Sequence, residues 1–280
     1  MKVSLLVALC VLSLQALAVD KVVYGEDNRA DVYETRNELF LRLARSTAAM
    51  IPNTSLRSTG SGMQIAGRTM AQRGFCATER FSDQPTAAMC SGFLVAPNLL
   101  VTAGHCIQSA ANCAANKWVF DYKMTDARTA PSMMASENVY SCKRVISTVL
   151  EGGNGNDYAI IELDRAVVGR APLAVRKTGR VAVGTEIVVI GHPTGLPTKV
   201  TDGAKVRSLS SQYFVANLDT YGGNSGSAVF NAKTGVVEGI LVRGENDYVT
   251  QAGCKATNYC PENGCRGEDV TFITNVPNIP

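Results

Sequence analysis

Short apolar runs separated by turn-forming residues fill the chain from Cys90 almost to its C-terminus. Most are about 4–8 residues long, rich in Val, Ile, Thr and aromatic residues, and bounded by Gly, Pro, Asn or Asp. They read GFLVA, LLVTA, KWVFDY, YAIIEL, EIVVIG, KVTDGAKVRSL, YFVANL, SAVFN, VVEGILV and VTFITNV. This pattern predicts an all-β protein of antiparallel strands, either a sandwich or a pair of barrels. Long helical periodicity does not accompany it, and parallel strands need crossover helices, so an α/β fold is not expected.

The region before residue 75 is more polar. The stretch DVYETRNELFLRLAR, residues 31–45, predicts one helix. Residues 52–74 are rich in Gly, Ser, Thr and Asn and predict a loop.

The first residues have the layout of a secretory signal peptide. Lys2 supplies a positive start, residues 3–14 are almost entirely apolar, and residues 16–18 read Ala-Leu-Ala, a small-x-small cleavage pattern. The alternative is a membrane anchor, but the run is too short to span a bilayer, which takes about 20 apolar residues. We therefore expect residues 1–18 to be removed and the protein to be secreted or periplasmic, with no membrane attachment after cleavage.

Composition describes an ordinary globular protein. Of 280 residues, 46% are hydrophobic and 18% charged, which is too apolar for a disordered chain and enough for one large all-β domain or two small ones. The net charge of +3 comes without a Lys/Arg stripe, so nucleic acid is not an expected partner.

The cysteines predict disulfides. Of nine in the sequence, Cys10 would leave with the leader, and eight remain: Cys76, Cys90, Cys106, Cys113, Cys142, Cys254, Cys260 and Cys265. An even number in an exported chain favours bridges. Zinc is the alternative, but the last three cysteines contain no C-x-x-C pair and the chain has two histidines. We expect neither a metal nor another cofactor.

Nucleophilic chemistry is suggested by a single serine in a glycine-rich turn. Ser225 lies in TYGGNSGSAVF, and a serine hydroxyl needs a neutral imidazole beside it to act as a nucleophile. His105 ends an apolar strand in LLVTAGHC, and His192 lies between turn formers in GHPTG and is interpreted as structural. Asp157, in NGNDYAIIEL, could orient an imidazole. Taken singly, each of these residues is more commonly structural.

Together, these residues resemble the trypsin-like serine proteases. The order His105, Asp157, Ser225 and the motifs VTAGHC, NDYAIIEL and GNSGS resemble that family's pattern over about residues 75–245. The resemblance implies two six-stranded antiparallel Greek-key barrels of the chymotrypsin type, with the active site in the cleft between them. It assigns residues 75–280 to the protease domain and leaves residues 19–74 as a short pro-segment and N-terminal extension.

The resemblance also implies roles. Ser225 would be the nucleophile, His105 the general base and Asp157 its orienting carboxylate, with the backbone N–H groups of Gly223 and Ser225 as the oxyanion hole. It further implies a Cys90–Cys106 disulfide beside the histidine.

One departure points to a particular branch of the family. Asn224 occupies the position where trypsin-like zymogens carry the aspartate that binds a new N-terminus, so that activation switch is expected to be missing. GGNSGS and the VVYGEDNR that begins at Val22 resemble the bacterial glutamyl endopeptidases instead. We therefore expect processing after Lys21. The alternative is a longer propeptide covering residues 19–60.

The specificity pocket differs from that branch. Leu241, in GILVRG, stands where the branch has a histidine, whereas Thr220 is retained. Asp219 lies six residues before Ser225, where enzymes of basic specificity carry a pocket carboxylate, so cleavage after Lys or Arg is predicted. Asp219 could instead be a hydrogen-bonded turn residue or be neutralised by Arg243. Cleavage after small or apolar residues, or after Glu, is the alternative.

The predicted function is thus a secreted, monomeric serine endopeptidase acting on polypeptides. A catalytically silent protease fold kept as a binding module is one alternative. An esterase with the same triad is another, but the Gly-x-Ser-x-Gly elbow of α/β-hydrolases is absent from GGNSGS.

Overall fold

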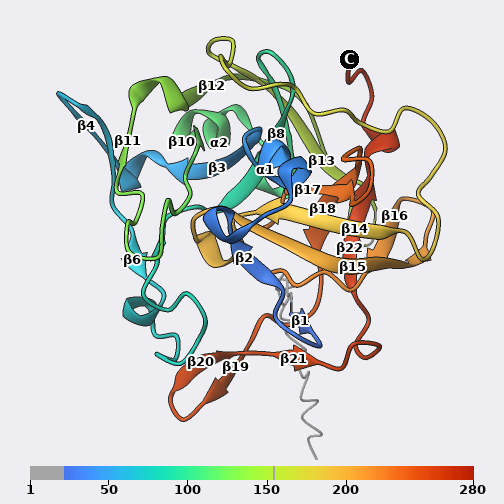
Figure 1. Ribbon diagram of the computed structural model, residues 1–280. Coiled ribbons are helices and arrows are strands. Elements are labelled where there is room, and N and C mark those ends of the chain that lie inside the picture. Colours follow the sequence, from blue (N-terminus) through green and yellow to red (C-terminus); the bar gives the residue numbers. More distant parts are fainter. Residues whose placement is uncertain (1–21, 154) are drawn as a thin grey trace, which may run out of the picture.

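A computed structural model of the chain describes residues 22–153 and 155–280, and two β-barrels make up most of it (Figure 1). The first is a closed antiparallel barrel with the strand order β10-β12-β13-β9-β8-β3. Its strands are β3 (Thr47–Pro52), β8 (Cys90–Ala96), β9 (Leu99–Thr102), β10 (Asn116–Phe120), β12 (Val139–Leu150) and β13 (Asp157–Leu163).

The second barrel has the order β14-β17-β18-β22-β16-β15, and pairing of β15 with β14 closes it. Its strands are β14 (Glu186–Gly191), β15 (Lys199–Leu209), β16 (Tyr213–Ala216), β17 (Ala228–Asn231), β18 (Val237–Arg243) and β22 (Glu268–Phe272). A further strand, β2 (Arg29–Asp31), adds to β15 from outside the ring. The predicted pair of six-stranded antiparallel barrels is confirmed.

Small sheets of two or three strands lie outside the two barrels. The strands β4 (Leu56–Thr59), β5 (Gly62–Ile65) and β11 (Met133–Met134) form one sheet, and β6 (Arg68–Thr69) pairs with β7 (Pro85–Thr86). The hairpin β19 (Tyr248–Gln251) and β20 (Cys254–Thr257) forms another sheet, and β1 (Val23–Tyr24) pairs with β21 (Tyr259–Cys260). The prediction of a loop over residues 52–74 was wrong, because backbone pairing within β4–β5 and β6–β7 orders much of it.

The described helices are short. Helix α1 (Glu38–Ala44) begins where the Asn37 side chain accepts hydrogen bonds from the first free backbone N–H groups, and α2 (Ala110–Ala115) is capped by Ser109 in the same way. The helix predicted over residues 31–45 was too long, since Asp31 ends β2 and the Asn37 cap fixes the start of α1. Among the described residues, no helix is both long and apolar enough to cross a bilayer.

The barrel strands begin before residue 75, the predicted start of the protease domain. β3 pairs with both β8 and β10, and without it the first barrel would be open. The predicted boundary therefore falls too late, because the apolar TAAMIP stretch is barrel strand and not extension. The predicted signal peptide and the cleavage after Lys21 lie outside the described residues.

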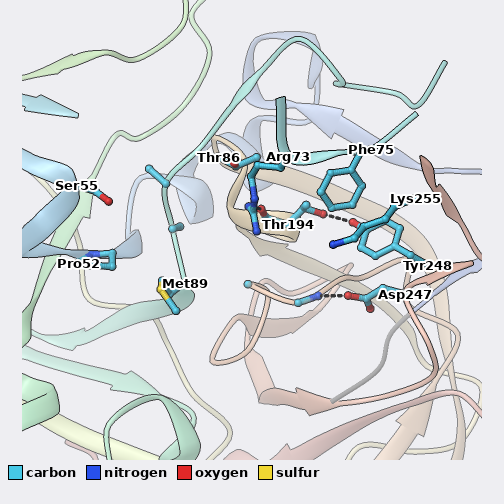
Figure 2. Close-up of a pocket in the computed structure, with 14 residues that line it drawn as sticks. Pro52, Ser55, Arg73, Phe75, Thr86, Met89, Thr194, Asp247, Tyr248 and Lys255 are labelled. Atoms are coloured by element: carbon cyan, nitrogen blue, oxygen red, sulfur yellow. Dashed lines mark hydrogen bonds between the residues drawn. The ribbon is translucent and has the colours of Figure 1, made fainter. Parts of the chain in front are cut away.

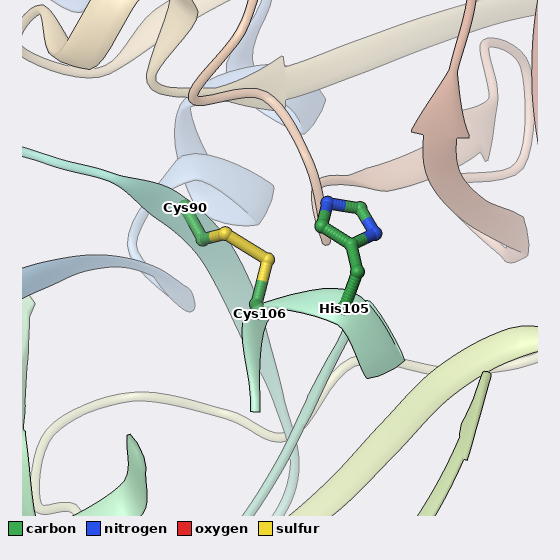
Figure 3. Close-up of side chains that lie close together, drawn as sticks. All are labelled: Cys90, His105 and Cys106. Atoms are coloured by element: carbon green, nitrogen blue, oxygen red, sulfur yellow. A yellow bond between two sulfur atoms is a disulfide. The ribbon is translucent and has the colours of Figure 1, made fainter. Parts of the chain in front are cut away.

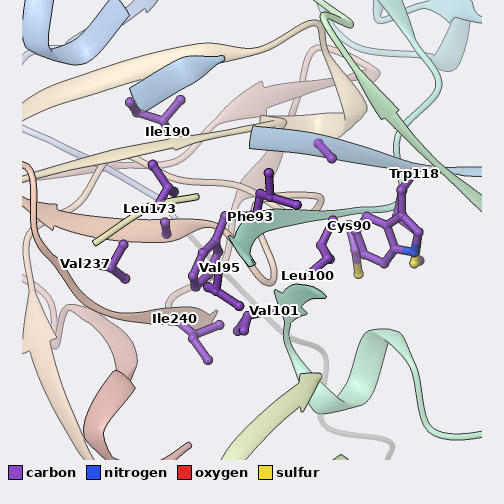
Figure 4. Packing of buried hydrophobic residues seen from close by; sticks show 14 of the residues in the cluster. Cys90, Phe93, Val95, Leu100, Val101, Trp118, Leu173, Ile190, Val237 and Ile240 are labelled. Carbon is purple, nitrogen blue, oxygen red and sulfur yellow. The ribbon is translucent and has the colours of Figure 1, made fainter. Parts of the chain in front are cut away.

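One apolar cluster runs through the first barrel and into the interface with the second. Phe93, Leu100 and Trp118 of the first barrel and Ile190 and Ile240 of the second belong to it, and all five are fully buried (Figure 4). Because this cluster is continuous between the barrels, burial of apolar surface holds them together and fixes the loops that meet at their junction.

Four disulfides use the eight described cysteines. The expected Cys90–Cys106 bridge is present, closing a loop that in the chain-entropy model is worth about 3 kcal/mol. The others are Cys76–Cys254, Cys113–Cys142 and Cys260–Cys265. Cys254 does not pair with Cys260 or Cys265, which follow it closely in the sequence, but with Cys76, 178 residues before it.

Candidate active site

His105 and Asp157 meet because β9 and β13 are neighbours in the first barrel. His105 lies in the 3-10 turn Gly104–Cys106 that follows β9, and Asp157 begins β13. The Asp157 carboxylate lies 2.7 Å from His105 Nδ1 and also accepts the His105 backbone N–H at 3.0 Å. Asp157 is buried, and His105 is partly exposed. This pairing places the imidazole proton on Nδ1 and leaves Nε2 as the basic nitrogen.

A glycine precedes the histidine for a steric reason. A Cβ on Gly104 would lie 2.0 Å from the Val149 carbonyl oxygen and 2.9 Å from that of Tyr158. The turn that carries His105 is therefore packed directly on the backbone of β12 and β13, which limits its movement.

Ser225 lies next to the Cys90–Cys106 disulfide. Its carbonyl oxygen is 3.8 Å from Cys106 Sγ and accepts the Ser91 N–H at 2.8 Å. A ring nitrogen of His105 and the sulfurs of Cys90 and Cys106 lie within 4.8 Å of one another (Figure 3). The serine turn and the imidazole thus share one sulfur as a neighbour. These groups do not form a metal site, because both sulfurs are committed to the disulfide.

The serine lies in a tight turn that ends at β17. Asn224 N–H donates to Tyr221 O, and Ser227 N–H donates to Asn224 O, both at 2.9 Å. Gly223 adopts φ +97°, and a Cβ there would lie 2.5 Å from the His192 carbonyl oxygen. The buried Asn224 side chain accepts the Ser227 hydroxyl, so it is tied within the turn itself.

Ser91, which no sequence motif singles out, connects this turn to the first barrel. Its hydroxyl donates to Gly223 O at 2.8 Å and accepts the His192 N–H at 3.0 Å. Its carbonyl accepts the Thr102 hydroxyl at 2.7 Å. Ser91 is fully buried, and the one sequence signal was its position next to Cys90. We infer that it holds the backbone of Gly223 and Ser225 in place.

For the peptide hydrolysis that the family resemblance implies, replacing Ser91 by alanine is expected to lower kcat by about 10-fold, or ~1.4 kcal/mol, while KM changes little. Ser46→Ala is the matched control, since Ser46 is an equally buried hydroxyl that donates to Ala171 O, outside the Ser225 turn. Both variants should lose about 1–3 kcal/mol of unfolding free energy in urea. A Ser91→Ala enzyme with unchanged kcat would show that the hydroxyl is structural alone.

His192 does not fit the role of the base that the sequence predicts for His105. It is fully buried, its Nδ1 lies 3.1 Å from the Leu196 carbonyl oxygen, and burial lowers its pKa to about 4. Its role is structural, because its backbone carbonyl and N–H contact Gly223 and Ser91.

Comparison with known families agrees with this geometry. The family model for a trypsin-like peptidase domain matches residues 90–240, from the first cysteine of the disulfide to β18. The chain belongs to this family.

The relatives of this trypsin-like peptidase include a glutamyl endopeptidase of Bacillus licheniformis, 27% identical over 145 residues. The match covers 50% of the chain and 45% of that protein, so the chain matches less than half of the relative's length. The solved structure of a Glu endopeptidase in complex with MPD superposes on 90% of this chain with a TM-score of 0.52 and 18% sequence identity. The alignment includes 94% of the endopeptidase chain. The structure of human heparin binding protein aligns with 83% of this chain, at a TM-score of 0.51 and 15% sequence identity. The alignment includes 88% of the heparin binding protein chain. These two structures share the fold.

The carboxylate of Asp219 in this trypsin-like peptidase does not match its predicted role. One oxygen accepts the Tyr24 N–H at 2.7 Å and the other the Asn28 N–H at 2.9 Å. Burial raises the pKa of Asp219 to about 7. Asp219 therefore anchors the N-terminal segment, as the hydrogen-bonded alternative expected. Arg243 does not neutralise it, because Arg243 pairs with Asp269 at 2.9 Å.

A different carboxylate lies beside Thr220. Glu268, at the start of β22, is fully buried and accepts the Thr220 hydroxyl at 2.9 Å and the Tyr24 hydroxyl at 3.2 Å. A Cβ on Gly244 would meet this carboxylate at 1.9 Å, so only glycine leaves it room there. Leu241 is buried in the apolar cluster of the second barrel. Glu268 could not be singled out from the sequence, because nothing in GEDVTF marks its side chain as facing Thr220.

Proposed function

We propose that this protein is a secreted serine endopeptidase that hydrolyses polypeptides through an acyl-enzyme. The observation that carries the proposal is the short contact of Asp157 with His105 Nδ1, in a turn whose next residue, Cys106, has its sulfur 3.8 Å from the Ser225 carbonyl oxygen. Membership of the trypsin-like peptidase family and the four disulfides support it.

In this mechanism, Ser225 Oγ attacks the scissile carbonyl carbon while His105 Nε2 takes the hydroxyl proton. Asp157 stabilises the imidazolium that forms and stays ionised. The carbonyl oxygen becomes an oxyanion bound by the N–H groups of Gly223 and Ser225. His105 then gives its proton to the leaving amine, and the C–N bond breaks. Water, deprotonated by His105, attacks the acyl-enzyme and restores Ser225.

Digestion of casein by the purified, secreted protein tests this function. The proposal expects peptide fragments from the wild-type protein, and no digestion after treatment with an organophosphonate. A silent binding module would leave casein intact. An esterase would hydrolyse an activated ester and leave casein intact.

We further propose that Glu268, and not Asp219, provides the preference for Lys or Arg before the scissile bond. Its buried carboxylate lies against Thr220 and Gly244, and a cationic substrate side chain would supply the opposite charge. Glu at the same substrate position would be repelled.

A peptide library scanned at the residue before the cleaved bond checks this specificity. The wild-type enzyme should favour Lys and Arg, and Glu268→Gln should lower kcat/KM for these substrates by about 100-fold, or ~2.7 kcal/mol, relative to an Ala substrate. Asp219→Asn is the control, and it should leave the Lys-to-Ala ratio unchanged. A preference for Glu before the cleaved bond would contradict this proposal, and would instead suggest a glutamyl specificity like that in the name of the relative.

Processing after Lys21 remains part of the proposal. Val22 is fully buried, and its carbonyl oxygen accepts the Thr220 N–H at 3.2 Å. We expect N-terminal sequencing of the secreted protein to give Val-Val-Tyr-Gly. A mature start beyond Ser58 would contradict this, since it would remove β1, β2 and β3.

A further inference from the structure

A cleft of about 440 Å³ lies beside the serine turn and is separate from the residues assigned to the side chain before the scissile bond (Figure 2). Gly222 and Gly223 form one wall, and Ala88 and Met89 form another. The remaining end of the cleft is lined by Arg73, Phe75, Tyr248 and Lys255. The described residues that line this cleft do not include Thr220, Leu241 or Glu268, which belong to the proposed pocket for the side chain before the scissile bond.

The cleft is on the leaving-group side of the proposed reaction. Met89 directly precedes Cys90, whose disulfide partner Cys106 follows His105. His105 is the group that protonates the leaving amine, so a substrate segment that continues past His105 runs toward Met89. Gly223, two residues before Ser225, borders the same space. The residues that follow the scissile bond would therefore enter this cleft.

Two cations flank an aromatic ring in the cleft. The Arg73 guanidinium lies 6.0 Å and the Lys255 ammonium 5.3 Å from the centre of the Phe75 ring. Both cationic side chains are exposed, and Arg73 uses one nitrogen to donate to the Thr194 carbonyl at 3.1 Å, so its other donors can face the cleft. The arrangement gives the end of the cleft a positive charge on an apolar base.

The acidic residue that lines the cleft is held by the serine turn. One carboxylate oxygen of Asp247 accepts the Gly222 N–H at 2.8 Å. Asp247 therefore helps to shape the wall next to Ser225, while the neighbouring Tyr248 packs edge-on against Phe75 at 4.7 Å. Asp247 is bonded to Gly222, whereas the Arg73 and Lys255 cations lie 6.0 and 5.3 Å from the centre of the Phe75 ring.

The cationic end is preorganised by the backbone. Phe75 and Lys255 form an isolated parallel bridge, Cys76 N–H donates to Lys255 O, and Lys255 N–H donates to Gly74 O, both at 3.0 Å. The adjacent Cys76–Cys254 disulfide locks the same two segments together. A substrate carboxylate would thus meet two cations whose backbones are already fixed, which lowers the entropy lost on binding.

We propose that this cleft is a subsite for the first or second residue after the scissile bond and that it selects an acidic side chain. The inference rests on the proposed endopeptidase function and adds a second specificity, carried by Arg73 and Lys255, to the one assigned to Glu268. Because both cations are exposed, each pair with a substrate carboxylate is screened by water, and the expected preference is modest.

Matched peptides test this subsite. They share one Lys before the scissile bond and carry Glu, Ala or Lys at the first and second positions after it. We expect kcat/KM to be about 10-fold higher for Glu than for Lys at one of these positions, and the ratio to fall toward 1 at 1 M NaCl. The double variant Arg73→Glu, Lys255→Glu should reverse the ratio. A control variant, Arg128→Glu, Lys233→Glu, makes the same charge change at exposed sites that do not line the cleft and should keep it.

The outcomes separate this inference from the proposed function. If the Ala peptide is cleaved by all variants but the Glu-to-Lys ratio is near 1, or is the same in the cleft variant as in wild type, the acidic subsite is wrong and the endopeptidase stands. If no peptide is cleaved and Ser225 is not labelled by an organophosphonate, the function itself is wrong and the inference falls with it.

Discussion

Replacing His105 by alanine is expected to reduce kcat for casein or peptide hydrolysis by about 10⁶-fold. His105 is the one histidine in contact with a buried carboxylate, with Asp157 Oδ2 2.7 Å from its Nδ1, and in the proposed mechanism it is the group that removes the Ser225 proton. Steady-state kinetics on a fluorogenic peptide measure the loss.

The matched control for this variant is His192→Gln. His192 Nδ1 contacts the Leu196 carbonyl oxygen, a contact that a glutamine amide can replace, and burial already keeps its pKa low. Activity of His192→Gln should therefore stay within a few-fold of wild type. Equal losses in both variants would contradict the assignment of the base to His105, as would a His105→Ala enzyme that keeps most of its activity.

The second large effect is expected at Gly223. Alanine there would put a Cβ 2.5 Å from the His192 carbonyl oxygen and 2.8 Å from the Gly195 nitrogen, at φ +97°. Because these neighbours are backbone atoms, the turn itself must move, and the N–H groups that the proposed mechanism assigns to the oxyanion would change their direction. We expect kcat to fall about 10²–10³-fold with a smaller change in KM, as when an oxyanion donor is lost.

Gly169→Ala separates this effect from backbone strain. Gly169 also has a positive φ, +74°, but a Cβ there meets nothing within 4 Å. Gly169→Ala should cost about 1 kcal/mol of unfolding free energy and leave kcat unchanged. If Gly223→Ala retains full kcat while losing stability to the same degree as Gly169→Ala, the turn does not form an oxyanion hole.

The barrels could be predicted from the sequence because their strands carry local signals. Runs such as YAIIEL and EIVVIG combine β-branched residues with flanking turn formers, and they became β13 and β14. TAAMIP was missed because its alanines carry little strand preference, and its place between β8 and β10 is set by pairing with them. A local pattern cannot report such partners.

The pocket residues could not be predicted because tertiary contacts decide their roles. The position of Asp219 relative to Ser225 suggested a substrate contact, but its oxygens bind N–H groups of Tyr24 and Asn28 from the far end of the chain. Glu268 and Ser91 act across the fold in the same way, through Thr220 and Gly223. Buried polar side chains need partners, and the sequence does not say which ones the fold supplies.

The most direct test of the account is labelling of the secreted protein by an organophosphonate, located by peptide mass spectrometry. The account predicts stoichiometric modification of Ser225 in the wild-type protein and little or none in His105→Ala within the same time. Modification at another residue, or an unmodified Ser225 in a correctly folded wild-type protein, would contradict it.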